Sequence, residues 1–550
     1  MNLFRLCLFV PLLASAAPVQ TPLPHLERAG GATQLLVDSR PFLIQGGETS
    51  NSHSEPGYLR PAWPKFKALN LNTLVVPVYW DVIEPAEGRF DFATVDGLLA
   101  DARANGMHLV LLWFGSWKNS MSCYVPAWVK TDTVRFPRAR DSRGQAMEIL
   151  SPFAAANSDT DARAFAALMR HIREEDGAQH TVILVQVENE IGMIPEARDR
   201  CQAADASFAG PVPAGLTDYL VQHRESLAPE LRDRWAAKGA RTTGTWTDVF
   251  GEGPATAELF MAWSFGRYVE VVAAAGQKEY PLPFYANAAL IRRGFQPGQY
   301  PSAGPLPHLI DVWRAAAPAL SFISPDIYFP NFKEWADRYV RGGNPLFVPE
   351  ALRSADAEVN NLYAFGACGG FGFSPFGIES IAEPAASLLG ASNDLIRQLT
   401  PLILAHQGDG TMTALLPPAA DQTKPHEVAF GGLVLGVTYE RLESPGLADG
   451  VINEAGDRPG SRAPLPAGAI VIQLEPDELL IGGIGVTVTF SAPTPGDPYI
   501  GILNCEEGRY EDGQWRHVRW LNGDQTHQGR HVRLEPGRFS LQRVRLYRYR

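Results

Sequence analysis

The stretch TVILVQVENEIG, residues 181–192, contains the pattern that decides the fold. Its first half is β-branched and aliphatic, which is typical of a parallel strand buried on both faces. Two carboxylates, Glu188 and Glu190, then follow on either side of Asn189. Charged side chains are seldom buried unless they are paired. This strand end is therefore a solvated loop, a structural ion pair or a functional site.

Further apolar runs resemble this strand, and amphipathic helices separate them. One helix, residues 161–177, places Phe165, Leu168 and Met169 on one face and stops near Gly177. Eight alternating strands and helices predict a closed (β/α)8 TIM barrel, with a doubly wound open sheet as the alternative. The other seven strand candidates are residues 41–47, 72–80, 108–115, 282–290, 320–329, 345–351 and 370–377.

The first 16 residues resemble a secretory signal peptide. Arg5 supplies a positive charge, residues 6–13 form an apolar segment, and Ala14-Ser15-Ala16 is a small-residue cleavage site. The apolar segment is too short to span a bilayer. We expect an exported protein, periplasmic or secreted, that is cleaved near Ala16 and has no membrane anchor.

The remaining chain divides into two expected domains. Residues 17–414 would form the catalytic barrel, with an insertion at about 193–257 that is expected to make a helical lid or wall near the mouth. A Pro-rich linker is expected at 415–427. Residues 428–550 contain short β-type runs broken by Gly and Pro, which predicts an all-β sandwich.

Composition and motifs exclude several classes of function. The formal net charge is −12 and the chain has no polybasic tract, which argues against a nucleic-acid surface. The sequence contains neither H-E-x-x-H nor G-x-S-x-G and shows no metal-ligand cluster, so we expect no metal and no cofactor. An exported protein permits disulfides, and a bridge between Cys123 and Cys201 is left open.

Two carboxylates are expected to meet at the barrel mouth. Glu190 ends the fourth predicted strand, and Glu350, in LFVPEALRS, ends the seventh. Barrel enzymes carry their chemistry at the carboxyl ends of the strands. One carboxylic acid can protonate a departing glycosidic oxygen while another carboxylate about 5–5.5 Å away attacks the sugar. Asn189 is placed to bind the sugar 2-hydroxyl.

Two motifs resemble a known family. QVENEIG (186–192), together with VYWDVIEPAEGRFDF (78–92), resembles glycoside hydrolase family 35, the retaining β-galactosidases of clan A. The resemblance implies that Glu190 is the acid/base and Glu350 the nucleophile, a choice between Glu188 and Glu190 that the residues alone leave open. In clan A barrels a tyrosine at the position of Tyr328 donates a hydrogen bond to the nucleophile; simple packing is the alternative.

The chain departs from the family pattern at two places. Residues 114–128 read FGSWKNSMSCYVPAW where family members commonly carry a Gly-Pro-Tyr segment, and Ile191 replaces the usual Tyr. The chain therefore resembles a divergent bacterial branch that carries a C-terminal β domain.

Several other residues are candidates for sugar contacts. Trp113, Trp117 and Asn119 follow the third strand, where they would stack on a sugar or bind a hydroxyl, or else belong to the core. Glu48 would bind a hydroxyl or face water. Glu84 is expected to brace the loop after strand two, and Glu188 to hold a neighbouring cation or loop.

The function expected from these features is a retaining exo-β-galactosidase. Its partner would be a β-galactoside oligosaccharide, for example a xyloglucan-type fragment of plant cell wall. The alternatives are another clan A activity (β-glucosidase, exo-β-glucosaminidase or endo-glucanase) and a carbohydrate-binding protein without catalysis. The β domain would shield the barrel, bind polymer or contribute to a homodimer contact.

Overall fold

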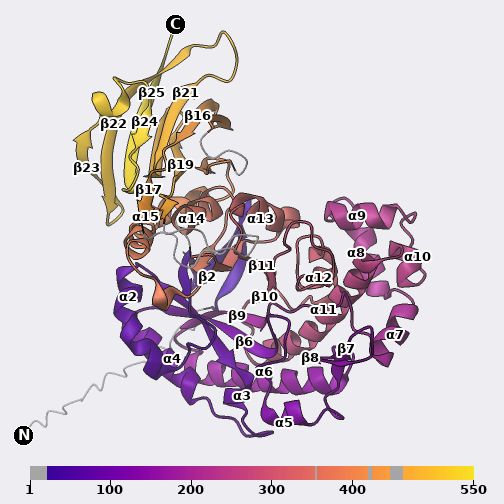
Figure 1. The fold of residues 1–550 in the computed structure, drawn as a ribbon. Helices are drawn as coiled ribbons and strands as arrows, with labels where there is room; N and C mark the ends of the chain where they lie inside the picture. The colour runs from indigo at the N-terminus through magenta and orange to yellow at the C-terminus, as the bar shows by residue number, and fades with distance from the viewer. Residues whose placement is uncertain (1–21, 354–355, 419–423, 446–461) are drawn as a thin grey trace, which may run out of the picture.

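The computed structural model describes residues 22–353, 356–418, 424–445 and 462–550, in two parts: a barrel and a β domain that projects from one side of it (Figure 1). The signal peptide predicted for residues 1–16 lies outside the described residues.

Eight parallel strands close into a barrel, which confirms the predicted (β/α)8 fold. Each predicted strand range overlaps one strand of the barrel. In chain order the strands are β4 (Ile44–Glu48), β5 (Thr73–Tyr79), β6 (His108–Lys118), β9 (Val182–Asn189), β10 (Phe284–Ala289), β11 (Phe322–Ile327), β12 (Phe347–Ala351) and β13 (Gly372–Pro375).

A helix follows each strand and packs on the outside of the barrel (Figure 1). The apolar stripe predicted on residues 161–177 is buried against the barrel, and it belongs to α6. The eight helices are α2 (Trp63–Ala68), α4 (Ala93–Asn105), α6 (Ala155–Asp176), α11 (Pro254–Glu279), α12 (Ile310–Ala316), α13 (Phe332–Tyr339), α14 (Ala357–Gly366) and α15 (Ala385–His406).

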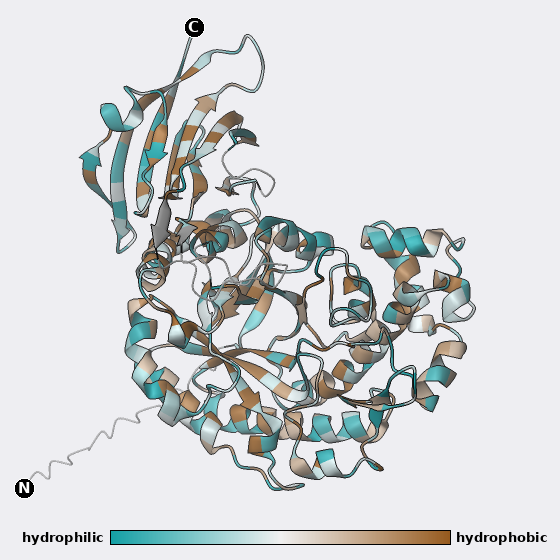
Figure 2. Ribbon diagram, viewed as in Figure 1, coloured by the Kyte–Doolittle hydropathy of each residue, from teal (hydrophilic) through white to brown (hydrophobic). Residues whose placement is uncertain are grey.

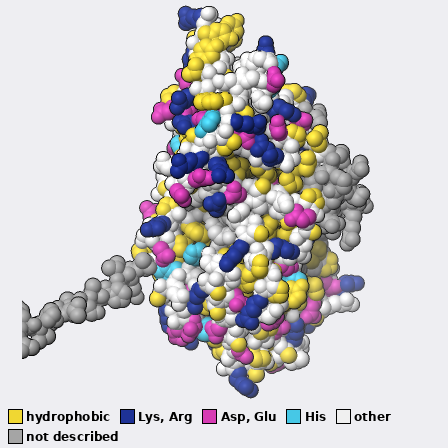
Figure 3. All heavy atoms as spheres, turned by 90° about the vertical axis from the view of Figure 1, so that its left-hand side faces the viewer, with side chains coloured by type: hydrophobic (Ala, Val, Ile, Leu, Met, Phe, Trp, Pro, Cys, Tyr) yellow, Lys and Arg dark blue, Asp and Glu magenta, His cyan; other side chains and the backbone are white. Residues whose placement is uncertain are grey.

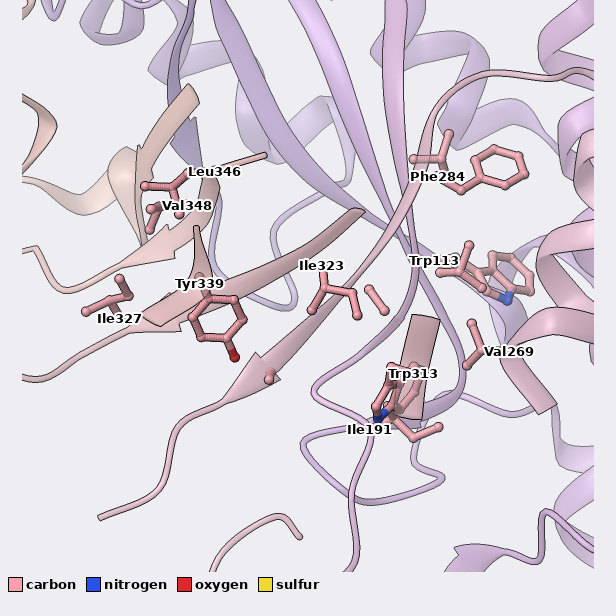
Figure 4. Close-up of a cluster of buried hydrophobic side chains, with 14 of the residues drawn as sticks. Trp113, Ile191, Val269, Phe284, Trp313, Ile323, Ile327, Tyr339, Leu346 and Val348 are labelled. Atoms are coloured by element: carbon pink, nitrogen blue, oxygen red, sulfur yellow. The ribbon is translucent and has the colours of Figure 1, made fainter. Parts of the chain in front are cut away.

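Alternation along the strands decides which side chains enter the barrel. Figure 4 shows Ile323 and Ile327 of β11 in the apolar layer outside the barrel, and Figure 2 shows how apolar the strands are. The residues of β11 that alternate with these two isoleucines therefore face the barrel interior. Inside, stacked and edge-on aromatic rings fill the floor: Tyr285, Phe322, Phe347 and Phe371.

A small N-terminal sheet covers the amino ends of the barrel strands. It consists of β1 (His25–Ala29), β2 (Ala32–Val37) and β3 (Arg40–Phe42), and Leu35 and Val37 share a core with the aromatic floor. Because this end is sealed by apolar side chains, the opposite, carboxyl end is left for polar residues.

Long βα connections build up the rim at the carboxyl end. The connection after β6 contains α5 (Ala127–Thr131) and the hairpin of β7 (Arg138–Arg140) and β8 (Ala146–Leu150). The connection after β9, where a helical insertion was expected, contains α7 (Gln202–Ala209), α8 (Ala214–Gln222), α9 (Pro229–Ala236) and α10 (Trp246–Phe250). These four helices stand as a wall beside the barrel (Figure 1). Cys123 and Cys201 are both free thiols, so no bridge joins these connections.

The C-terminal part is an antiparallel sandwich of a six-stranded and a four-stranded sheet, as predicted. It starts earlier than expected, because β14 already pairs with β19 where the linker was predicted to begin. The six-stranded sheet comprises β14 (Met412–Leu415), β19 (Gly468–Glu475), β20 (Glu478–Ile484), β25 (Ser540–Tyr549), β22 (Tyr499–Glu511) and β23 (Gln514–Trp520). The four-stranded sheet comprises β15 (His426–Phe430), β16 (Leu433–Tyr439), β21 (Val486–Ser491) and β24 (Val532–Leu534); β17 (Glu443–Pro445) and β18 (Arg462–Pro464) form a separate hairpin.

The two parts share one apolar contact. Ile470, Leu480 and Leu541 of the six-stranded sheet belong to the same core as the barrel helices. At the far tip of the domain, hydrophobic side chains reach the surface (Figure 3), where Tyr547 stacks on the exposed Tyr549. Among the described residues, no helix is both long and apolar enough to cross a membrane.

The contact between α6 and α11 yields a stability prediction. A Cβ on Gly276 would lie 2.3 Å from a ring carbon of Phe165, so Gly276→Ala forces the two helices apart. We expect the free energy of unfolding to fall by about 1–3 kcal/mol, measured by chemical denaturation. Gly215→Ala in α8 is the matched control, because its nearest neighbour, Trp263, is at an ordinary 3.6 Å. An equal loss in both variants would contradict the packing argument.

Candidate active site

Three buried carboxylates meet at the carboxyl end of the barrel. Glu190 follows β9, Asp326 lies in β11 and Glu350 in β12, and one oxygen from each lies within 4.8 Å of the others. Glu190, Asp326 and Glu350 are only 6%, 1% and 5% exposed, respectively. The predicted pair Glu190 and Glu350 is thus brought together, near the separation of about 5–5.5 Å that retaining glycosidases use.

The backbone at the end of β9 decides which glutamate reaches this cluster. Glu188 and Glu190 have φ values of 63° and 45°, in the left-handed region that side chains other than glycine rarely adopt. The turn sends Glu188 away from the mouth, where its carboxylate accepts the Trp117 main-chain N–H at 2.7 Å. Glu188 therefore holds a loop, and Glu190 takes the position at the mouth.

Hydrogen bonds hold the strained turn in place. The Gln186 side chain donates to the Glu188 carbonyl at 3.0 Å, and Asn287 on β10 accepts the Glu190 main-chain N–H at 2.9 Å. From the end of β6, the main-chain N–H of Ser120 donates to the Glu190 carbonyl at 3.1 Å. Such bonds offset a backbone strain of about 1–3 kcal/mol per residue.

Glu350 is poised between neutral and charged forms. Burial and the charge of Glu190 raise the pKa of Glu350 from 4.5 to about 7, while Lys118 and the Tyr328 hydroxyl oppose the rise. Tyr328 donates a hydrogen bond to Glu350 Oε1. The other oxygen, Oε2, has no hydrogen-bond partner among the described residues. The two oxygens of Glu350 thus differ, because Tyr328 holds one and no described protein group holds the other.

Polar atoms without protein partners surround the cluster. Both carboxylate oxygens of Glu48 and both amide atoms of Asn189 are buried and form no hydrogen bond within the described part of the chain. Burial and the charge of Glu350 raise the pKa of Glu48. Buried polar atoms normally have partners, so these unpaired groups are available to bind the polar groups of a ligand.

Two predicted sugar contacts are wrong. Trp113 points outward from the barrel, where its indole N–H donates to Asp161 of α6 at 2.8 Å. Trp117 is fully buried against Phe265 and Tyr268 of α11. Both side chains pack between strand and helix, because their positions on β6 alternate with those that face the barrel interior.

Two other residues named from the sequence, Asn119 and Glu84, form hydrogen bonds within the protein. Asn119 lies at the rim, and its main-chain N–H donates to the Asn189 carbonyl at 3.2 Å. Its side-chain oxygen accepts a hydrogen bond from the Lys118 ammonium. Glu84 accepts the Trp80 indole N–H and the Gly88 main-chain N–H, each at 2.8 Å, and so braces its loop as expected.

Sequence reasoning missed Asp326 and Lys118. Asp326 follows Ser324 by two positions on β11, so strand alternation placed it on the interior face once the strand was recognised. Lys118 is buried beside Glu48 and Glu350, and it precedes Asn119 in an unusual segment that does not follow the family pattern. A buried lysine has no sequence signature apart from its neighbours.

Three carboxylates are also a donor set for a divalent cation. The surroundings oppose a cation. The Lys118 ammonium lowers the pKa of both Glu48 and Glu350, and the Tyr328 hydroxyl and the Asn287 amide donate into the cluster. A cation would be repelled by these positive and hydrogen-bearing groups.

Comparisons with known proteins relate the barrel to β-galactosidases. Residues 60–254 match the glycoside hydrolase family 42 model, described as beta-galactosidase, so family 42 is the family found and family 35 is not confirmed. This range contains Asn189 and Glu190 but not Glu350. Residues 389–533 match a domain of unknown function.

A beta-galactosidase from Xanthomonas manihotis is 29% identical over 218 residues, which cover 38% of this chain and 33% of that protein. The chain thus matches about a third of the relative's length. Among solved structures, the beta-galactosidases of Marinomonas ef1 and Rahnella sp. R3 each give a TM-score of 0.45, at 13% and 16% identity. They cover 65% and 66% of this chain, and 60% and 57% of their own.

The raised pKa of Glu350 predicts how stability depends on pH. The folded protein binds this proton more tightly than the unfolded chain, so the stabilisation is complete below pH 4.5 and is lost as the pH rises through about 7. The loss amounts to about 3 kcal/mol. Glu350→Gln removes it, and we expect the variant to gain stability over the parent at pH 8 but not at pH 4.5. Chemical denaturation at both pH values tests this, and an equal difference at both would contradict it.

Proposed function

We propose that the protein is a retaining β-galactosidase with Glu350 as nucleophile and Glu190 as acid/base. The observation that carries the proposal is the pair of buried carboxylates, with oxygens within 4.8 Å, at the carboxyl end of a TIM barrel. The match of residues 60–254 to a family described as beta-galactosidase supports the sugar preference.

The first step transfers the sugar to the protein. The unpartnered oxygen Oε2 of Glu350 attacks the anomeric carbon, and the bond from that carbon to the departing oxygen breaks as Glu190 protonates it. Mutual repulsion makes the pair retain one proton. The Tyr328 hydroxyl and the Lys118 charge favour the ionised form of Glu350, which is the form that attacks the sugar.

The second step releases the sugar. Glu190, now ionised, takes a proton from a water molecule whose oxygen attacks the anomeric carbon, and the bond to Glu350 breaks. Two inversions leave the sugar with its original configuration. Asn189, whose amide atoms are buried without protein partners, binds the 2-hydroxyl. Glu48 and Lys118 bind further hydroxyls of the sugar.

The substrate proposed is the terminal galactose of a plant-wall oligosaccharide, such as a xyloglucan fragment. The low exposure of Glu190 and Glu350, 6% and 5%, suits a pocket that admits one chain end rather than a groove that binds the middle of a polymer. The wall of α7–α10 closes one side of the barrel (Figure 1). The apparent signal at residues 1–16 supports export to where such fragments occur.

Variants of the two glutamates test the roles separately. We expect Glu350→Gly to lower kcat by about 10⁴-fold or more, and azide to restore turnover by filling the space and giving the α-galactosyl azide. Glu190→Ala should retain activity on aryl galactosides with good leaving groups, because these need no proton, and azide should give the β-galactosyl azide. NMR of the products distinguishes the anomers. Identical products from both variants would contradict the assignment.

The hydrogen bond from Tyr328 gives a further test. Tyr328→Phe keeps the ring but removes the hydroxyl that holds Glu350 Oε1. A lost hydrogen bond to a charged group is worth about 1.5–3 kcal/mol, so we expect kcat to fall roughly 10–150-fold with a smaller change in KM. Tyr339→Phe is the control, because its hydroxyl donates to the Pro305 carbonyl instead. Equal loss in both variants would remove Tyr328 from the mechanism.

A substrate panel separates the rival activities. Nitrophenyl β-galactoside, β-glucoside and β-glucosaminide are compared at equal concentration, and hydrolysis of the galactoside should dominate. An endo-glucanase would ignore these small substrates and would lower the viscosity of a polymer instead. Calorimetry that shows galactoside binding without hydrolysis would favour the non-catalytic alternative.

A further inference from the structure

Asp326 is joined to Glu190 through a single asparagine. Asn287 accepts the Glu190 main-chain N–H at 2.9 Å, and its amide nitrogen donates to Asp326 Oδ2 at 2.5 Å. The link crosses three adjacent strands, from β9 through β10 to β11. It meets the chain at Glu190, where φ is 45° and the backbone needs support. Asp326 therefore supports, through Asn287, the backbone turn that sets the direction of the Glu190 side chain.

Asp326 also lies beside the two glutamates. Asp326 Oδ1 is buried and has no hydrogen-bond partner by the geometric criterion within the described ranges. One oxygen of this residue lies within 4.8 Å of oxygens of both Glu190 and Glu350, and Asp326 pairs directly with Glu350 in the parallel register of β11 and β12. The carboxyl group thus lies beside the reacting pair.

Three ionised carboxylates cannot occupy this space together. Charges at this separation repel strongly in a site from which water is excluded. Glu350 has the Tyr328 hydroxyl and the Lys118 charge to favour its ionised form. Asp326 has one neutral amide donor, and burial together with the charges of Glu350 and Glu190 raises its pKa well above the ordinary value. Asp326 therefore has less support for its ionised form than Glu350 has, and the charge of the neighbouring Glu48 acts on it in the same direction.

We propose that Asp326 is a positioning residue that stays protonated and donates a hydrogen bond to the Glu190 carboxyl while it holds the Glu190 backbone through Asn287. This inference rests on the proposed function. The O–H of Asp326 stabilises the carboxylate that Glu190 becomes after it has protonated the leaving group. The same bond keeps Glu190 directed at the anomeric carbon during both steps.

Two substitutions separate this role from a charged one. Asp326→Asn has nearly the same shape, stays neutral, can accept from Asn287 with its oxygen and can donate to Glu190 with its nitrogen. We expect kcat within about tenfold of the parent and unchanged limbs of the pH profile of kcat/KM, because no ionisation is removed. Asp326→Ala removes the donor and should lower kcat by about 100-fold or more, with KM changed by less than threefold.

The controls guard against a merely structural effect. Asp311→Asn changes another buried aspartate, 2% exposed, whose partners are the Ala228 N–H at 2.7 Å and the Tyr219 hydroxyl in the wall of the insertion. It should lower the denaturation midpoint without moving the pH profile. If Asp326→Ala does not fold, Asp326→Leu, which fills the space but forms no hydrogen bond, replaces it.

Each outcome has one reading. Equal loss in Asp326→Asn and Asp326→Ala would overturn the proposal, since it would mean that Asp326 acts as an anion. Near-parental kcat in both variants would also overturn it, because Glu190 would then need no support. If the unmodified protein does not hydrolyse β-galactosides, the proposed function itself is wrong. An assay of the unmodified protein therefore distinguishes that result from a failure of the Asp326 proposal.

Discussion

A carboxylate that is removed from water loses its hydration, and a second one a few ångströms away adds repulsion. The barrel imposes both conditions on Glu190, Asp326 and Glu350, because parallel strands bring all their carboxyl ends to one edge while apolar rings seal the other. The cluster can exist only if protons are shared among its members and donors are aimed at them. Tyr328, Asn287 and Lys118 supply these donors and this charge.

The electrostatic demand explains the unusual backbone at the end of β9. A regular strand would place Glu188 and Glu190 on the same face, because residues two apart share a face. The left-handed turns at both glutamates separate them instead. Glu188 goes to the layer between barrel and helices, where burial and the adjacent Asp161 raise its pKa, and Glu190 reaches the mouth. Strain in the main chain thus keeps Glu188 apart from the cluster, beside which the buried Glu48 already lies.

The β domain and the insertion occupy different sides of the barrel (Figure 1). The sandwich packs on the barrel through an apolar contact that includes Ile470, Leu480 and Leu541. The wall of α7–α10 grows directly from the strand that bears Glu190.

The sequence alone determined the eight strands and their alternation with helices, because strand periodicity is local. It also placed Glu350 and the pair Glu188 and Glu190 at strand ends, and the family resemblance chose Glu190 over Glu188. The direction of each side chain depended on tertiary structure. Trp113 and Trp117 seemed to be sugar contacts because they follow a strand, yet the register of β6 turns them toward α6 and α11. Asp326 and Lys118 passed unnoticed because their importance arises only from charges that the folded chain places beside them. Proximity between residues distant in sequence is created by the closed barrel, and pattern along the chain does not encode it.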